Sequence, residues 1–352
     1  MHAEPGAIEA RALWLTAPRT AELRRELVPA PGPGQLRVRA IASAPSHGTE
    51  LLVYRGQVPA DLPLDLPALA GSFAFPIKYG YASVGRVLDV GPGVAGFAPG
   101  DAVFVHHPHQ DVYAVAARPA VGPAPLRLPA GLDPLLGVFT ANVETAVNVL
   151  LDTPLRLGET ALVFGQGTVG LLIAQLLKRA GARVLAVEPL ARRRELALAV
   201  GADVALAPDE ALPARVRELT EGRGADVAVE VSGAGAALQA AIDSVAVEGT
   251  VVAVSWYGAK PVALTLGGHF HRGRVRVRSS QVGRLDPALA PRWDHTRRLA
   301  LAATLLGELR LAELITHRIP FAQAPAAYRL LDERPDEVVQ VVLTYDDVER
   351  GA

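Results

Sequence analysis

The chain has 352 residues, half of them hydrophobic, which is enough for two domains with cores of their own. Its 35 basic and 36 acidic residues are interspersed and nearly cancel, so the composition favours neither a nucleic-acid partner nor a membrane partner. Cysteine is absent, which excludes disulfides, thiolate–metal sites and a cysteine nucleophile.

The apolar segments of the sequence are all too short to span a bilayer. The first 15 residues also lack the charged region and following apolar region of a signal peptide. We therefore expect a cytoplasmic protein.

Residues 1–130 alternate short β-rich runs with Gly and Pro turns, which predicts a β-barrel-like domain. Examples of these runs are Gln35–Ala42, Ala82–Val90 and Ala102–Val105. Apolar residues then recur with helical period over residues 130–151, until Pro154 ends the pattern.

From Thr160 to about Gly283 strands and helices alternate, which predicts a parallel sheet. The expected strands are Ala161–Phe164, Arg183–Val187, Ala225–Val231, Thr250–Val254 and Arg274–Ser279. The expected helices are Val169–Arg179, Ala191–Val200 and Ala234–Ser244. Two further helices, Trp293–Leu309 and Ala324–Asp332, and a strand, Val338–Leu343, complete the pattern.

The first strand and helix of this region are joined by a glycine-spaced turn. Gly165 permits the tight turn, Gly167 lets the backbone approach a pyrophosphate, and Gly170 allows close packing of helix and strand. The start of the helix, with Thr168 and Val169, offers N–H groups and a positive dipole end to phosphates. The pattern predicts a dinucleotide site, and the alternative is an ordinary glycine-rich turn of another α/β protein.

The second strand ends in Glu188, whose carboxylate can accept hydrogen bonds from both hydroxyls of an adenosine ribose. The same charge would repel the extra phosphate of NADP, so we predict NAD as the cofactor. Because Arg192–Arg194 could attract that phosphate, NADP remains an alternative.

The whole chain resembles the medium-chain dehydrogenase/reductases. The shared marks are HGTELLVYRG (His47–Gly56), KYGYASVGRV (Lys78–Val87), PGD (Pro99–Asp101), GQGTVG, Glu188 with Gly201-Ala202-Asp203, GADVAVEVSG (Gly224–Gly233) and LITHRIPFAQAPAAYRLL (Leu314–Leu331). The resemblance implies an α/β protein with a GroES-like β-barrel catalytic domain (residues 1–142 and 285–352) and a Rossmann doubly wound parallel sheet (residues 143–284).

Within this family the chain resembles the zinc-free branch of 2-desacetyl-2-hydroxyethyl bacteriochlorophyllide a dehydrogenase-like proteins. The stretches that carry this likeness are PIKYGY (Pro76–Tyr81), HPHQ (His107–Gln110), ANVETAVN (Ala141–Asn148), SWYG (Ser255–Gly258) and LGGHFHRGRVRVRSSQVG (Leu266–Gly283). Because scaffolds are shared across many chemistries, the branch does not name the substrate.

The chain departs from the zinc enzymes of this family at their metal ligands. The first ligand position holds His47, the position of a second ligand reads Gly80-Tyr81-Ala82, and the third falls near Ala141. One ligand of three is too few for catalytic zinc, so we predict no metal. His106, His107 and His109 could rebuild a metal site, but we favour a surface or pocket-lining loop.

Without a metal, hydrogen-bonding groups must hold the substrate oxygen and move its proton. Thr49 matches the family's proton-relay hydroxyl, and its alternative role is a helix cap. His47 could carry the proton, or be a buried, hydrogen-bonded histidine. Tyr81 could donate to a carbonyl oxygen, or be a core tyrosine. Glu50 is interpreted as structural.

The resemblance also assigns residues to the cofactor. The assigned residues are Thr145, Arg193, Ser232, Ser255, Trp256 and Gln281. Thr145 would lie under the nicotinamide ring, Arg193 beside the adenosine ribose, and Gln281 close to the nicotinamide. Trp256 and Tyr257 follow a sheet strand, where they could line the substrate pocket.

The leading hypothesis is a zinc-independent oxidoreductase that transfers a hydride between NAD(H) and a secondary alcohol or ketone of medium or large size. The alternatives are an NADPH-dependent enone or quinone reductase and a non-catalytic dinucleotide-binding sensor. The family resemblance also implies a homodimer formed through the edge strand Arg274–Ser279, whose alternating Arg and Val leave one face apolar.

Overall fold

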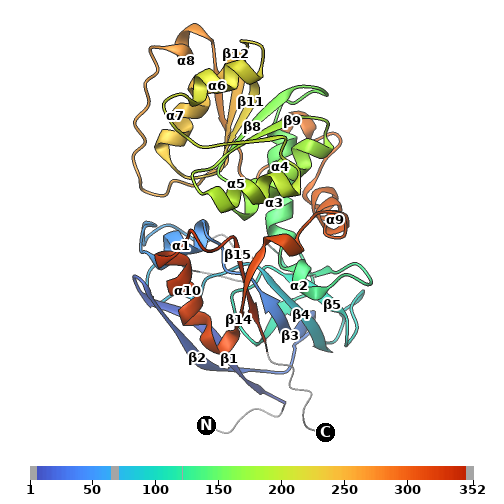
Figure 1. The fold of residues 1–352 in the computed structure, drawn as a ribbon. Coiled ribbons are helices and arrows are strands. Elements are labelled where there is room, and N and C mark those ends of the chain that lie inside the picture. The colour runs from blue at the N-terminus through green and yellow to red at the C-terminus, as the bar shows by residue number, and fades with distance from the viewer. Residues whose placement is uncertain (1–5, 65–70, 121, 346–352) are drawn as a thin grey trace. The chain divides into compact units, whose positions relative to one another are not determined.

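The computed structural model describes residues 6–64, 71–120 and 122–345, which form two compact units (Figure 1). The first unit comprises the described residues within 1–141 and 314–352, and the second is Asn142–Glu313. Residues 285–313 thus cluster with the parallel sheet, whereas the family resemblance implied that they belong to the GroES-like domain. Residues 1–5, on which the expectation of no signal peptide partly rests, lie outside the described residues.

The first unit is built mostly from antiparallel strands, with β14 and β15 paired in parallel. β1 (Ile8–Ala17) and β2 (Thr20–Val28) pair with each other. Among the described residues a second sheet has the order β14-β15-β3-β4-β5-β7, with β6 also on β3. Its strands are β3 (Gln35–Ser43), β4 (Ser83–Val90), β5 (Ala102–Val105), β6 (Val112–Ala116), β7 (Leu126–Arg127), β14 (Ile315–Pro320) and β15 (Gln340–Thr344).

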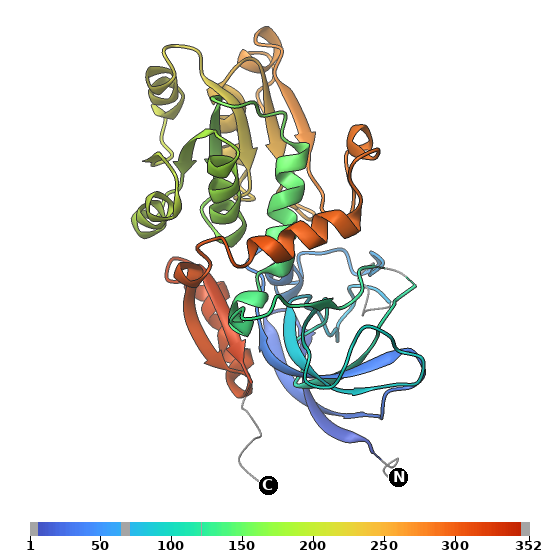
Figure 2. The same cartoon turned by 90° about the vertical axis from the view of Figure 1, so that its right-hand side faces the viewer.

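The C-terminal segment returns to this unit, where β15 pairs antiparallel with β3 (Figure 2). Helix α10 (Ala324–Glu333) buries Ala324, Ala327, Tyr328 and Leu331, which share one helical face. That face packs in one apolar cluster with the short helix α1 (Thr49–Tyr54), and the rings of Tyr54 and Tyr328 lie 5.3 Å apart. The core of the first unit therefore joins the start and the end of the chain.

The second unit is the expected Rossmann sheet, and the predicted fold class is confirmed. Its parallel strands follow the order β10-β9-β8-β11-β12-β13 in the part of the chain that is described. These strands are β8 (Thr160–Phe164), β9 (Arg183–Val187), β10 (Val204–Leu206), β11 (Ala225–Glu230), β12 (Val245–Ala253) and β13 (Arg276–Ser279). All five residues of β8 are buried, because helices cover both faces of such a sheet.

The remaining helices connect or flank these strands. They are α2 (Pro134–Gly137), α3 (Thr140–Asp152), α4 (Thr168–Arg179), α5 (Ala191–Val200), α6 (Leu212–Leu219), α7 (Gly235–Ser244), α8 (His269–Arg272) and α9 (His295–Leu305), with 3-10 turns at Pro287–Leu289, Ala312–Leu314 and Phe321–Gln323. No helix in the described ranges has both the length and the apolar character needed to cross a membrane.

The helical pattern over residues 130–151 is divided into two helices. The Asp133 carboxylate accepts a hydrogen bond from Leu135 N (2.9 Å) and Pro134 opens α2, so this helix has its own start signal. The Thr140 hydroxyl donates to the carbonyl oxygen of Gly137 (2.6 Å) where α3 begins. Periodicity alone does not reveal such a break.

Candidate active site

The glycine-spaced turn after β8 has the properties that a dinucleotide site requires. Gly165 has φ of +92°, and a Cβ on Gly170 would lie 1.9 Å from the Gly165 carbonyl oxygen. Both positions therefore need glycine for the fold itself. A Cβ on Gly167 would meet no atom within 4 Å, so the protein leaves open space beside this residue. α4 begins at this turn with Gly167 as its cap residue, which directs the positive end of the helix dipole toward it.

Glu188 lies at the carboxyl end of β9 and is 3% exposed. Its carboxylate accepts hydrogen bonds from Gln166 N (2.8 Å) and Leu190 N (3.1 Å), which fixes it beside the turn. The buried side-chain oxygen of Gln166 has no hydrogen-bond partner among the described residues. Such an oxygen is usually satisfied by a ligand or water. These residues fit a dinucleotide, with carboxylate oxygens placed for its ribose hydroxyls.

Two cationic candidates follow Glu188 on α5. The guanidinium of Arg194 donates to the carbonyl oxygens of Glu188 (2.8 Å) and Pro189 (2.6 Å), so it closes the end of β9. Arg193 is half-buried one residue earlier. The positive charge therefore sits next to the Glu188 carboxylate, as the alternative cofactor NADP would also require.

The carboxyl ends of β11 and β12 are joined by Glu230, which is fully buried. One carboxylate oxygen accepts from Ser232 N (2.7 Å) and the Ser232 hydroxyl (2.6 Å), and the other accepts from the Tyr257 hydroxyl (2.6 Å). The Ser255 hydroxyl accepts from Gly233 N (2.8 Å). Tyr257 therefore anchors this loop through its hydroxyl, and its expected place in the wall of a substrate pocket stays a prediction.

Trp256 lies between the anchored residues Ser255 and Tyr257, and 42% of it is exposed. Its indole is the aromatic surface that the loop presents at the carboxyl end of the sheet, where ligands of α/β proteins bind. The expectation for Trp256 as a site residue is thus compatible with its position.

Thr145 is half-buried on α3, and two later residues of this helix, Asn148 and Asp152, belong to a polar network. Asn148 donates to Asp152 (3.0 Å) and lies within 3.4 Å of the Gln281 carbonyl oxygen. Ser280 donates its hydroxyl proton to Asp152 (2.6 Å). The backbone beside Gln281 is therefore tied to the helix that carries Thr145.

Arg298 of α9 completes this network, and no sequence motif indicated it. Its guanidinium donates to Glu144 (2.9 and 3.1 Å) and to the Asn148 side-chain oxygen (2.6 Å), and Arg298 is only 2% exposed. A buried arginine at helical spacing is invisible in the sequence because exposed arginines occupy most such positions.

In the first unit, the turn before α1 carries the predicted catalytic residues. Thr49 is the first residue of α1, the cap residue is Gly48, and no side chain caps this helix. The hydroxyl of Thr49 instead hydrogen-bonds to the phenol of Tyr81, as does Ser46. Burial and the nearby charge of Glu50 raise the pKa of Tyr81 to about 12. His47 is half-buried in the same turn.

Glu50 lies beneath this turn and is fully buried. Its carboxylate accepts from Ser46 N (3.1 Å), from His109 Nε2 (2.9 Å) and from the Tyr328 hydroxyl. The structural role of Glu50 is therefore to hold the turn that carries Thr49. His109 was considered only as a metal ligand, so its bond to Glu50 was not anticipated.

The histidine loop differs from the surface or pocket-lining loop that we favoured. His107 and His109 are both buried, and the ring of His107 stacks on Tyr113 at 3.8 Å. Burial lowers the pKa of His106 to about 4 and that of His107 to about 3. Within the described ranges, no three His, Asp or Glu side chains are grouped so that they could hold a metal ion.

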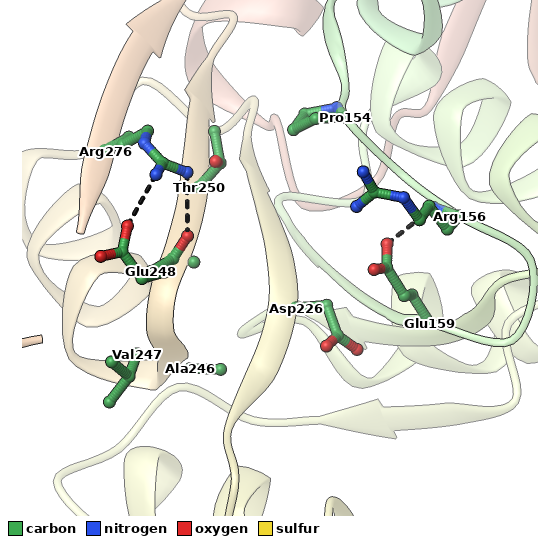
Figure 3. Close-up of a pocket in the computed structure, with 10 residues that line it drawn as sticks. Pro154, Arg156, Glu159, Asp226, Ala246, Val247, Glu248, Thr250 and Arg276 are labelled. Atoms are coloured by element: carbon green, nitrogen blue, oxygen red, sulfur yellow. Dashed lines mark hydrogen bonds and ion pairs between the residues drawn. The ribbon is translucent and has the colours of Figure 1, made fainter. Parts of the chain in front are cut away.

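The second unit contains a cavity of about 220 Å³ (Figure 3). Arg276 and Glu248 form an ion pair on one side of it, and Arg156 and Glu159 lie on the other. It is lined by the amino-terminal parts of β12 and β13, whereas ligands of α/β sheets bind at the carboxyl ends. The cavity is therefore not the dinucleotide site.

Comparisons with known proteins agree with this geometry. Residues 168–297 match the family model described as zinc-binding dehydrogenase. The chain is 30% identical over 354 residues to the D-guloside 3-dehydrogenase of Escherichia coli, covering 95% of this chain and 99% of that protein. It is 32% identical over 267 residues to the L-threonine 3-dehydrogenase of Pyrococcus abyssi, covering 68% of this chain and 74% of the other.

Among solved structures, the 2R,3R-butanediol dehydrogenase of Bacillus subtilis superposes with a TM-score of 0.78 at 22% identity, covering 96% of this chain and all of that one. At this identity the superposition supports the fold. The full-length similarity to the Escherichia coli enzyme extends through both units and includes the glycine turn. The chain therefore belongs to the medium-chain dehydrogenase/reductases, the family of zinc-binding dehydrogenases, and is an NAD(P)-dependent dehydrogenase.

Proposed function

We propose that this dehydrogenase works without zinc and transfers a hydride between NAD(H) and a secondary alcohol or ketone of medium or large size. The observation that carries the proposal is the hydroxyl cluster of Ser46, Thr49 and Tyr81. Thr49 and Tyr81 occupy positions that serve substrate chemistry in the family. Thr49 matches the proton-relay hydroxyl, and Tyr81 stands where the zinc enzymes have a metal-binding histidine. The likeness to the zinc-free branch supports the same conclusion.

The residues at the family's metal positions do not fit zinc. The chain has no cysteine, and of the three ligand positions only His47 offers a ligand. The carboxylate three residues later, Glu50, already accepts hydrogen bonds from three donors of the protein. Catalytic zinc needs about three protein ligands and a water molecule. We therefore assign the chemistry to hydrogen-bonding side chains.

NAD, when bound, supplies the hydride acceptor. The glycine turn and Glu188 would hold its adenosine half, and Thr145, Ser255 and Gln281 would meet its nicotinamide half. Tyr81 stays protonated at neutral pH because its pKa is raised to about 12, so its phenol donates a hydrogen bond to the substrate oxygen. Thr49 bonds to the same phenol and relays the proton, and His47 can exchange it with water.

The relatives support a secondary alcohol as the reacting group. D-guloside 3-dehydrogenase and L-threonine 3-dehydrogenase are both named for carbon 3, which bears a secondary hydroxyl in each compound. The exposed indole of Trp256 offers an aromatic surface to a large substrate.

Untagged protein, purified without added metal, tests the reaction. We expect less than stoichiometric zinc, NAD-dependent oxidation of secondary alcohols, and the same rate after dialysis against a chelator. Stoichiometric zinc with loss of activity on chelation would overturn the zinc-free mechanism. Turnover of enones with NADPH alone would favour the reductase, and cofactor binding without turnover would favour the sensor.

Cofactor choice is tested at Glu188. The Glu188→Ala variant should bind NADH more weakly and narrow the difference between NAD and NADP, because the ribose hydroxyls lose their acceptor. Glu195→Ala, which removes an exposed acid of α5, is the matched control and should leave both affinities unchanged. An unchanged NAD preference in Glu188→Ala would count against NAD selection by this carboxylate.

We also propose that the chain forms a homodimer through β13. β13 is an edge strand that pairs only with β12 within the described sheet, and its Val277 is 41% exposed. An exposed edge is a natural template for pairing with a second chain. Light scattering should give the mass of a dimer for the wild type and a shift toward monomer for Val277→Asp. A monomeric wild type would contradict this assembly.

A further inference from the structure

We infer that Glu50, His109 and Tyr328 form a positioning triad, which holds the Ser46–Thr49 turn against Tyr81 in place of the metal and its ligands. This inference rests on the proposed zinc-free function. None of the three is assigned to contact the substrate, so each acts through the turn and not on the reacting atoms.

The triad is assembled from three distant parts of the chain. Glu50 lies in α1, His109 in the loop before β6, and Tyr328 in α10, and all three are fully buried. His109 Nε2 donates to the Glu50 carboxylate at 2.9 Å, and the Tyr328 hydroxyl donates to the same oxygen. A buried carboxylate is tolerated only with such donors, so the fold has been built around it.

A chain of hydroxyls fixes the orientation of the imidazole. His109 Nδ1 lies 2.8 Å from the Ser43 hydroxyl, which lies 2.8 Å from the hydroxyl of Tyr345. If Tyr345 donates to Ser43 and Ser43 donates to Nδ1, then Nε2 carries the proton that bonds to Glu50. Every donor in this chain then has an acceptor, and the Glu50 side chain accepts the hydrogen bond from Nε2.

The backbone next to Tyr81 is shaped to accept this ring. Gly80 has φ of +145°, and a Cβ at this position would lie 3.1 Å from His109 Nε2. The imidazole therefore packs directly on the residue that precedes Tyr81. His109 thus contacts both sides of the cluster, through Gly80 toward Tyr81 and through Glu50 toward Thr49.

Glu50 transmits this order to the reacting groups. One of its oxygens accepts from Ser46 N at 3.1 Å, and the hydroxyls of Ser46 and Thr49 bond to Tyr81. Loss of a donor to Glu50 would leave an uncompensated buried charge and loosen the turn. Because small misplacements of positioned groups reduce rates strongly, kcat should report this loosening.

The test compares His109→Phe, His109→Gln and His107→Phe. His109→Phe keeps the volume but removes both hydrogen bonds, and should lower kcat roughly 100-fold with an unchanged dissociation constant for NADH. His109→Gln retains a donor toward Glu50 and should restore most of kcat. His107→Phe keeps the stacked ring beside Tyr113 and should leave kcat unchanged.

A second comparison uses two smaller substitutions, which are less prone to prevent folding. Tyr328→Phe removes one hydroxyl and should lower kcat about tenfold, the effect of one lost hydrogen bond to a charge. Tyr113→Phe removes an equally buried hydroxyl that bonds to Ser83 and should leave kcat unchanged. Equal losses in the two variants, or no rescue by His109→Gln, would overturn the triad. A wild type without turnover would overturn the proposed function and the triad with it.

Discussion

The carboxylate of Glu144 on α3 and the guanidinium of Arg298 on α9 form an ion pair that is almost completely buried, with two nitrogen–oxygen distances of 2.9 and 3.1 Å. The pair joins the helix that carries Thr145 to a helix more than 150 residues later, as the separation of 154 positions shows. Both nitrogens donate to the same carboxylate oxygen, so two charge-assisted hydrogen bonds hold the guanidinium at one point of α3.

Replacing one residue of the Glu144–Arg298 pair should lower the free energy of unfolding far more than replacing both. Arg298→Met should lower the free energy of unfolding by about 3–5 kcal/mol, because the Glu144 charge is left buried without its partner. Glu144→Met combined with Arg298→Met should recover most of that loss. Urea unfolding of the wild type, Arg298→Met and the double variant measures these free energies.

The exposed ion pair Arg179–Glu308 is the control for this comparison. Arg179→Ala should change the free energy of unfolding by at most about 1 kcal/mol, because solvent screens exposed pairs. If the Glu144→Met/Arg298→Met double variant is as unstable as Arg298→Met alone, the loss does not come from an unpaired buried charge, and the explanation is wrong.

Substitutions at Gly167 and Gly170, in the turn after β8, should affect cofactor binding and folding separately. Gly170→Ala places a Cβ 1.9 Å from the Gly165 carbonyl oxygen, so the melting temperature should fall. Gly167→Ala places a Cβ where no protein atom lies within 4 Å, so the fold should be kept. The same Cβ would occupy the approach of the pyrophosphate, and NADH binding should weaken by tenfold or more, about 1.4 kcal/mol.

Calorimetry and NADH titration of both variants decide between these outcomes. Native NADH affinity in Gly167→Ala would contradict the assignment of the turn to the pyrophosphate. A melting temperature for Gly170→Ala equal to that of the wild type would contradict the packing argument.

The sequence predicted the parts of the fold that depend on local patterns. Gly165 and Gly170 could be recognised because their backbone requirements are fixed by the turn, and Glu188 because it follows a strand at a set distance. The parallel sheet could be predicted from its alternating strands and helices, but its strand order could not, because the order is set by tertiary pairing.

The contacts that cross long stretches of sequence could not be predicted in this way. The bond from His109 to Glu50 spans 59 residues and that from Tyr328 spans 278 residues. Such bonds depend on which side chains tertiary folding brings together, and a single His or Tyr carries no local pattern. For the same reason the histidine loop was interpreted as a surface or pocket-lining loop, although the fold buries it.

The Thr49 hydroxyl should matter for turnover and not for folding. Thr49→Val keeps the shape but removes the bond to Tyr81, and should lower kcat by about 100-fold, the lower range for a proton-transfer group. Thr49→Ser retains the hydroxyl and should stay close to the wild type. Because Thr49 does not cap α1, the melting temperature should be nearly the same in all three proteins. A large fall in melting temperature with unchanged kcat would restore the capping role.

The buried imidazole of His107 should make the first unit sensitive to acid. Burial is the main cause that lowers its pKa to about 3 in the folded protein, with the charge of Lys78 adding to it. In the unfolded chain the imidazole binds a proton below about pH 6.5, so the unfolded state gains protons that the folded state excludes. The stabilising contribution is therefore complete above pH 6.5 and is lost as the pH falls toward 3.

The expected slope for this one group approaches about 1.4 kcal/mol per pH unit well below pH 6.5, which amounts to about 2 kcal/mol between pH 6.5 and 4.5. Urea unfolding at several pH values should show this slope in the wild type and a shallower one in His107→Phe, which keeps the ring stacked on Tyr113 without a titrating nitrogen. His271→Gln changes an exposed histidine of α8 and should leave the slope as it is in the wild type. Parallel pH profiles for the wild type and His107→Phe would mean that His107 is already solvated in the folded protein.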